Sequence, residues 1–203
     1  MMKRVITIGR EFGSGGRTIA KMAGEKLGIP VYDNELLTEI ARESGLAKEY
    51  ISERAEDSSL GSFIARGLAS AGSYRQVTME EYLWNAQRKV IIDLAQKGSC
   101  IIVGRCADYI LKEKADCLKV FVYAAMEKRA ERIMSVYGEM SEESPEKRLR
   151  DKDKRRGAFY NYNTDMKWGD PHNYHICLDS GVLGLERCRD IICSLYEISL
   201  SQC

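Results

Sequence analysis

A glycine-rich segment near the start of the chain constrains the fold more than any other feature. The apolar run 5–8 leads into GREFGSGGRT, residues 9–18, and a helix-like segment follows at once. A strand that turns through glycines into a helix directs several backbone N–H groups at one point beside the positive helix end, and such a point suits a phosphate. The segment therefore predicts a phosphate-binding loop at the start of an α/β protein.

The loop departs from the usual P-loop pattern at its cation. The pattern G-x-x-x-x-G-K-[ST] carries a lysine after its last glycine, and Gly16 stands at that position here. Arg10 and Arg17 flank the loop, and either guanidinium could reach the β- or γ-phosphate with a planar, bidentate fork. Thr18 keeps a hydroxyl for magnesium. The other loop residues expected to contact the phosphates are Gly13, Ser14, Gly15 and Gly16.

Other interpretations of these glycines stay open. Gly9, Gly13 and Gly15 also fit the cofactor loop of short-chain NAD(P)-binding dehydrogenases, with Asp33 as the ribose-binding carboxylate. Those enzymes need a tyrosine four residues before a lysine, and none of the eleven tyrosines has one there. A glycine-rich turn can also hold a nucleotide or phosphate without transferring a group, as a regulatory protein would, or bind nothing.

Composition limits the number of domains and the class of partner. A chain of 203 residues, 44% hydrophobic and 30% charged, can bury one full core, so we expect a single domain over residues 1–203. Because 31 Lys and Arg stand against 30 Asp and Glu, no nucleic-acid surface is indicated and any anion site must be local. No run approaches the ~20 apolar residues that span a bilayer. The seven scattered cysteines lack a C-x-x-C motif and are typical of reduced thiols in a cytoplasmic protein.

Short apolar runs alternate with longer helical patterns, which predicts a mostly parallel five-stranded sheet between layers of helices. Strands are expected at 5–8, 29–32, 100–103, 118–123 and 174–178. Helices are expected at 18–27, 35–43, 79–96, 126–137, from 145 onward, and at 185–198. The weakly patterned segment 44–78 is predicted to be an insertion, either acceptor-binding or a plain surface loop. Its apolar pieces also allow a homodimer contact.

A second cationic cluster lies between residues 146 and 156, where seven basic residues stand against three acidic ones. On a helix, Arg148, Lys152, Arg155 and Arg156 share one face because their offsets are four, seven and eight. P-loop kinases of this size carry a lid at this position, so we predict a lid over residues 144–170 whose cations converge on the polyphosphate. The alternative is a solvated, salt-bridged helix.

Further candidates follow two of the predicted strands. Arg105 comes after the strand at 100–103, on the edge where open α/β sheets bind ligands, and it suits an acceptor phosphate. Asp33 falls on the same edge, where it could bind magnesium, a hydroxyl or a base amine, or cap the helix expected from Glu35. Asp108 is expected in the first turn of the next helix.

Four of these segments, 13–18, 31–37, 101–111 and 153–156, together resemble the cytidylate kinase-like family, a divergent branch of the P-loop nucleoside monophosphate kinases. The resemblance covers nearly the whole chain. It implies a P-loop phosphotransferase fold, ATP with Mg²⁺ as the donor, and a nucleoside monophosphate, with CMP or dCMP favoured, as the acceptor. Arg105 falls on the arginine of the family's Gly-Arg-Asp element, which contacts the acceptor, and Cys106 replaces the aspartate.

Overall fold

The computed structural model describes residues 4–33, 79–113, 115–138 and 143–198. The helix expected at 35–43 and the insertion expected at 44–78 lie outside these residues. Among the described residues, no helix is both long and apolar enough to cross a bilayer.

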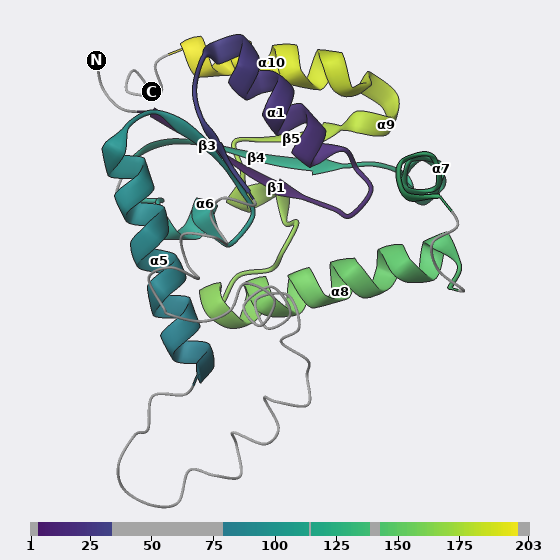
Figure 1. Cartoon of the computed structure of the whole chain (residues 1–203), viewed down its shortest axis with the longest axis horizontal. Helices are drawn as coiled ribbons and strands as arrows, with labels where there is room; N and C mark the ends of the chain where they lie inside the picture. The colour runs from purple at the N-terminus through teal and green to yellow at the C-terminus, as the bar shows by residue number, and fades with distance from the viewer. Residues whose placement is uncertain (1–3, 34–78, 114, 139–142, 199–203) are drawn as a thin grey trace, which may run out of the picture.

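A five-stranded sheet forms the centre of the described structure (Figure 1). Its strands are β1 (Arg4–Arg10), β2 (Val31–Tyr32), β3 (Cys100–Val103), β4 (Asp116–Tyr123) and β5 (Ile176–Asp179). They lie in the order β2-β3-β1-β4-β5, and every neighbouring pair is parallel. All five carboxyl ends therefore share one edge, which is where such sheets bind ligands.

Helices cover both faces of the sheet, as the alternating pattern predicts (Figure 1). On one side lie α1 (Gly16–Leu27) and α10 (Leu185–Glu197), and on the other lie α5 (Met79–Lys97), α6 (Ala107–Ile110) and α8 (Pro145–Thr164). The helix α7 (Met126–Tyr137) and the short helices η1 (Pro171–Asn173) and α9 (Ser180–Leu183) complete the described chain. The three-layer α/β architecture is thus confirmed.

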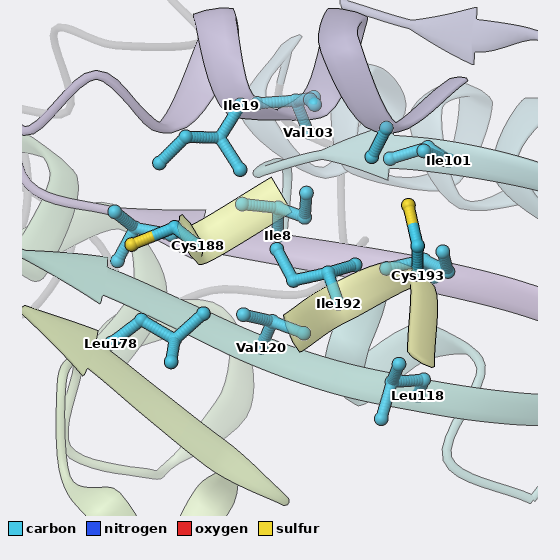
Figure 2. Close-up of a cluster of buried hydrophobic side chains, with 14 residues drawn as sticks. Ile8, Ile19, Ile101, Val103, Leu118, Val120, Leu178, Cys188, Ile192 and Cys193 are labelled. Carbon is cyan, nitrogen blue, oxygen red and sulfur yellow. The ribbon is translucent and has the colours of Figure 1, made fainter. Parts of the chain in front are cut away.

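Apolar side chains fill both interfaces between sheet and helices. Between the sheet and α1 with α10, the isoleucines Ile8, Ile19 and Ile192 pack together with Leu178 and Cys188 (Figure 2). A second cluster packs α5 and α6 against the opposite face of β1 and β3. Strands buried on both faces need a continuous apolar run, which is why these segments could be recognised in the sequence.

The ends of several elements differ from the sequence-based expectation. α7 and β3 have the expected bounds, and α8 begins at Pro145 with the Ser144 side chain capping it. α1 starts at Gly16, two residues early, because Gly15 at φ 79° forms its cap. β2 is shortened to Val31–Tyr32, since Pro30 just before it has no N–H to give to a sheet.

Candidate nucleotide and acceptor site

The loop between β1 and α1 has the backbone of an anion site. Gly13 and Gly15 have φ of 78° and 79°, values that glycine adopts without the strain that other residues meet. A Cβ on Gly13 would lie 2.9 Å from Cδ2 of Leu149 and 3.0 Å from the carbonyl oxygen of Arg129. No described side chain caps α1, and its first turn has no acidic residue, so the first N–H groups of the helix are available to an anion.

Two residues from distant parts of the chain hold this loop in place. Arg132 on α7 donates from Nη1 to the carbonyl oxygen of Gly13 at 3.1 Å. Ser180, at the start of α9, is buried and donates to the carbonyl oxygen of Ser14. The Ser14 hydroxyl itself donates to the carbonyl oxygen of Glu11 at 2.9 Å, so in this structure the hydroxyl supports the loop from within. Thr18 is exposed on the first turn of α1.

An ion-pair network around the buried Arg129 joins the loop to α7 and α8. Arg129 pairs with Asp153 and lies 3.4 Å from Glu11 through Nε. Asp153 also accepts a hydrogen bond from the backbone N–H of Phe12 at 2.7 Å. Burial raises the pKa of Glu11, although the N–H of Ala124 and the charge of Arg129 favour its ionised form. The predicted lid helix α8 is therefore docked on the loop through Asp153.

The stem of Arg10 lies against Gly16, the residue that stands in place of the loop lysine. A Cβ on Gly16 would lie 2.7 Å from Cβ and 3.1 Å from Cγ of Arg10, so the stem of Arg10 covers that glycine. The guanidinium continues over Gly104, where an added Cβ would overlap Nη1. Arg10 thus runs from the loop to the turn after β3.

Asp33 lies beside both loop arginines. Its carboxylate is 2.7 Å from Nε of Arg17 and 4.0 Å from Nη2 of Arg10. The Arg17 side chain is 45% exposed, whereas that of Arg10 is 15% exposed. Both guanidiniums therefore belong to one charged cluster with Asp33, and Arg10 is its inner member.

The turn after β3 presents Arg105 in an unusual backbone conformation. Gly104, Arg105 and Cys106 have φ of 73°, 59° and 54° in succession, and each non-glycine residue in this region costs about 1–2 kcal/mol. Gln87 on α5, which is buried, donates to the carbonyl oxygen of Arg105 at 3.0 Å. Strain of this kind is retained where the surroundings fix it and function uses it.

A small, partly open pocket with a volume of about 40 Å³ lies at this edge of the sheet. Residues from β1, the β3 turn, α6, α8 and the loop before β5 line it: Gly9, Arg10, Gly104, Arg105, Cys106, Asp108, Arg156, Phe159, Tyr160, Trp168 and Tyr174. The cations lie towards the loop, because Arg156 donates to the carbonyl oxygen of Arg10 at 3.4 Å and stacks 5.4 Å from the Phe12 ring. The arrangement suits an anionic ligand.

The remaining part of the pocket carries a carboxyl and two phenols. Tyr160 donates to Oδ2 of Asp108 at 2.6 Å, and both groups are buried. Burial raises the pKa of Asp108 by more than the Tyr160 hydrogen bond and the charge of Lys119 lower it. Burial likewise raises the pKa of the Tyr160 and Tyr174 hydroxyls. Titratable groups shifted by burial within a pocket mark candidate functional sites.

The four basic residues predicted to converge from α8 are not all brought to this pocket. Arg156 is among its lining residues, whereas Arg155 is exposed and Arg148 and Lys152 are half-buried along the helix. The face of α8 turned to the loop and pocket consists of Leu149, Asp153, Arg156 and Tyr160. That the four basic residues bind a polyphosphate stays a prediction.

Sequence reasoning missed several residues of this site. Asp108 does lie in the first turn of α6 as expected, but its burial against Tyr160 was not foreseen. Arg129 and Arg132 stand three apart on α7, directly after the carboxyl end of β4, and that position is the signal that could have found them. Gln87, a polar residue among the apolar positions of α5, could have been found in the same way.

The order of the strands bears on the dehydrogenase interpretation. In a dinucleotide-binding sheet the second strand lies beside the first, whereas here β3 lies beside β1 and β2 is outside it. The described sheet therefore does not have the dehydrogenase arrangement.

Known proteins resemble this chain over nearly its whole length. A cytidylate kinase of Archaeoglobus fulgidus is 26% identical over 95% of this chain and 94% of its own. Among solved structures, an uncharacterised protein of Eubacterium ventriosum is 27% identical with a TM-score of 0.72, over 96% of this chain and 99% of its own. Shikimate kinase of Acinetobacter baumannii, 18% identical, has a TM-score of 0.51 over 100% of this chain and 95% of its own, which confirms the P-loop kinase fold.

The family model named "Cytidylate kinase-like family" matches residues 5–182. That range includes the loop, Asp33, the β3 turn and all of α8. Family and fold together support a nucleotide kinase-type phosphotransferase. The chain belongs to the cytidylate kinase-like family.

Proposed function

We propose that this protein transfers a phosphoryl group from ATP to a nucleoside monophosphate, with CMP or dCMP favoured. One observation carries the proposal. A loop fit for a polyphosphate and a pocket lined by Arg10, Arg105 and Arg156 lie side by side, and Arg10 reaches from one to the other. A phosphoryl transfer needs a donor polyphosphate beside an acceptor phosphate, and the loop and the pocket offer two anion sites on either side of Arg10.

The donor side consists of the loop and the start of α1. The glycine-lined backbone from Gly13 to Gly16 and the uncapped helix end would hold the phosphates through N–H groups. Thr18 would hold magnesium, which when bound supplies charge neutralisation on the phosphates. No side chain is needed as a base, because a phosphate acceptor is already an anion and the protein mainly positions charges.

Arg10 and Arg17 together would supply the cation that the loop lacks. Arg10 has its stem against Gly16 and its more buried guanidinium over Gly104, whereas Arg17 is more exposed and held by Asp33. A phosphate arriving between them would compete with Asp33 for both. Arg17→Ala should lower turnover by ~10² or more, as other oriented phosphoryl-transfer cations do.

The acceptor side consists of the β3 turn and α8. Arg105 would bind the acceptor phosphate, with its backbone held by Gln87. Arg156 would close the site from α8, and Asp153 keeps that helix against the loop. The cations Arg148, Lys152 and Arg155 would extend the positive surface along the same helix.

The test is ADP release with ATP and magnesium across a panel of nucleoside monophosphates and small hydroxyl acceptors. Arg105→Gln should abolish acceptor-dependent release, and Lys112→Gln, which removes a half-exposed lysine just beyond α6, should not. If the wild type binds ATP but releases no ADP with any acceptor, the protein is a nucleotide-binding regulator and the proposal is wrong. Release with hydroxyl acceptors alone would also overturn the assignment to nucleotides.

A further inference from the structure

A cavity much larger than the acceptor pocket lies at the last two strands of the sheet, and the proposed function does not use it. Its volume is about 400 Å³, within the size range of sites that hold small molecules. It is partly open to solvent. The loop after β1, the strands β4 and β5, and the segment that joins α8 to β5 supply its lining: Glu11, Phe121, Tyr123, Trp168, Gly169, Pro171 and Cys177.

The cavity lies on the face of the sheet opposite α1 and α10. Val122 packs in the core with those two helices, so Phe121 and Tyr123, its neighbours along β4, point to the other face. Cys177 pairs in register with Phe121 and shares that face. On this side α5 and α6 pack mainly on β1 and β3, whereas the segment that carries Trp168 lies over Phe121. A chain segment therefore covers the last strands and leaves the cavity beneath it.

Aromatic rings form the walls of this cavity. Trp168 stands edge-on to Phe121, with the ring centroids 5.5 Å apart. Gly169 passes close over the same ring, because an added Cβ there would lie 3.3 Å from Cζ of Phe121. Tyr123 adds a third ring, which is 38% exposed. Aromatic faces carry negative charge density, so such walls attract a cation and also bury an apolar body.

Glu11 gives the cavity its charge. Among the lining residues, which all belong to the described part of the chain, Glu11 alone is charged at neutral pH. Its carboxylate accepts from the N–H of Ala124 at 3.2 Å and lies 3.4 Å from Nε of Arg129. Both contacts use Oε2, and the side chain is 26% exposed. Oε1 therefore lies outside both contacts and can accept from a ligand.

The charges around Glu11 also favour a cation. Arg129 is shared between Glu11 and Asp153, and Asp179 is a third carboxylate close enough to act on Glu11. Burial raises the pKa of Glu11 most, and the charges of Asp153 and Asp179 raise it further, although Ala124 and Arg129 act in the opposite direction. A positive group beside Glu11 would relieve this repulsion between carboxylates.

We propose that this cavity binds an organic cation, with a primary ammonium group at Glu11 and an apolar body among Phe121, Tyr123 and Trp168. The ammonium would donate to Oε1 of Glu11, and the ring faces would attract its charge. A neutral ligand of the same shape would lose both interactions, and a carboxylate would be repelled. The cavity shares only Trp168 with the acceptor pocket, so this inference goes beyond the proposed function and does not depend on it.

Equilibrium binding of three small probes to the full chain tests the inference. The probes are 2-phenylethylamine, 2-phenylethanol and 3-phenylpropanoate, which at neutral pH present the same ring with a cationic, a neutral and an anionic end. Titration followed by saturation-transfer NMR measures each Kd. Cys177 locates the site, because it is half-buried whereas the other described cysteines are buried. Its rate of alkylation by iodoacetamide, read by peptide mass spectrometry, should fall when the cavity is occupied.

Two variants separate the charge from the walls. Glu11→Gln removes the charge at nearly constant size, and Glu131→Gln is its matched control, because Glu131 on α7 is exposed and outside the lining. Tyr123→Leu removes one ring without touching the ion pairs of Arg129, so it still tests the site if Glu11→Gln does not fold. Tyr162→Leu, at an exposed tyrosine of α8 outside the lining, is the second control.

The wild type should bind the amine at least about tenfold more tightly than the alcohol, the worth of a charge-assisted hydrogen bond, and bind the carboxylate most weakly. Glu11→Gln should weaken the amine about tenfold and leave the alcohol unchanged, Tyr123→Leu should weaken the amine about threefold, and both controls should bind as the wild type does. Equal affinity of the wild type for amine and alcohol, or unchanged amine affinity in Tyr123→Leu, overturns the inference. Amine binding that leaves the alkylation of Cys177 unchanged overturns it too, because the amine then lies elsewhere.

Discussion

Gly16→Lys, which restores the usual lysine of the loop, is expected to destabilise the protein. The new Cβ would lie 2.7 Å from Cβ and 3.1 Å from Cγ of Arg10, and atoms this close to the backbone cannot turn away as the end of a side chain can. Overpacking of this kind costs about 1–3 kcal/mol. At about 2–4 °C per kcal/mol for a domain of this size, Tm should fall by roughly 2–12 °C.

A second substitution, added to Gly16→Lys, tests whether the clash with Arg10 causes the loss of stability. Arg10→Gly together with Gly16→Lys removes the clashing atoms and should recover the loss, less the about 0.5–1 kcal/mol that glycine costs in a strand. Arg10→Ala should not rescue Gly16→Lys, because the Cβ that lies at 2.7 Å remains. Arg17→Gly combined with Gly16→Lys is the matched control. It should not restore the stability, since the atoms nearest to a Cβ at Gly16 do not include Arg17.

Thermal unfolding followed by circular dichroism measures these differences in Tm. Titration with ATP and magnesium measures whether the lysine introduced at position 16 binds the nucleotide. The double variant Arg10→Gly with Gly16→Lys should bind ATP, whereas Arg10→Gly alone should bind it weakly. A Gly16→Lys protein as stable as the wild type, or equal rescue by Arg17→Gly, would refute the steric argument.

Two further variants test the pocket itself. Asp108→Asn keeps an acceptor for Tyr160 and removes a carboxyl whose pKa is raised by burial. A carboxyl with a raised pKa in the folded state lowers the stability of the protein as the pH rises above the pKa of the unfolded state. The variant should therefore have a higher Tm than the wild type at pH 7, and the difference should shrink towards pH ~4. An equal difference at every pH would contradict this assignment. Gln87→Met keeps the bulk of the side chain but leaves the Arg105 carbonyl without its donor. The loss of about 1–2 kcal/mol should lower Tm by roughly 2–8 °C. An unchanged Tm would show that this hydrogen bond does not hold the β3 turn.

The sequence predicted the sheet well because each central strand is a continuous apolar run buried on both faces. It predicted the loop well because strand, glycines and helix are contiguous. The rotation of α8 could not be predicted in the same way, since Leu149 and Tyr160 are widely spaced apolar residues in a strongly charged helix and define no clear buried stripe. Shared spacing grouped Arg148, Lys152 and Arg155 with Arg156, but packing turns Arg156 to the pocket.

The inner part of the pocket could not be predicted because its members meet only through tertiary packing. Asp108 comes from α6, Tyr160 from α8, and Tyr174 from the segment just before β5. Each alone has an ordinary structural explanation, as a first-turn acid or a core aromatic. The hydrogen bond between Tyr160 and Asp108 becomes visible only when these elements have been placed in the fold.

The glycine at position 16 of the loop and the glycine at position 104 of the β3 turn have different physical explanations. The Cβ and Cγ of Arg10, at the end of β1, leave no room for a side chain at Gly16, whereas an added Cβ at Gly104 would meet the flexible end of Arg10, which can shift. A lysine at position 16 would clash with the stem of Arg10, and the proposal that an arginine supplies the missing charge accounts for the substitution. Gly104, the glycine of the Gly-Arg element, has a φ of 73°, which glycine adopts without the strain that other residues meet. Positions 10 and 16 therefore act as one unit, in which a larger residue at position 16 requires a smaller one at position 10.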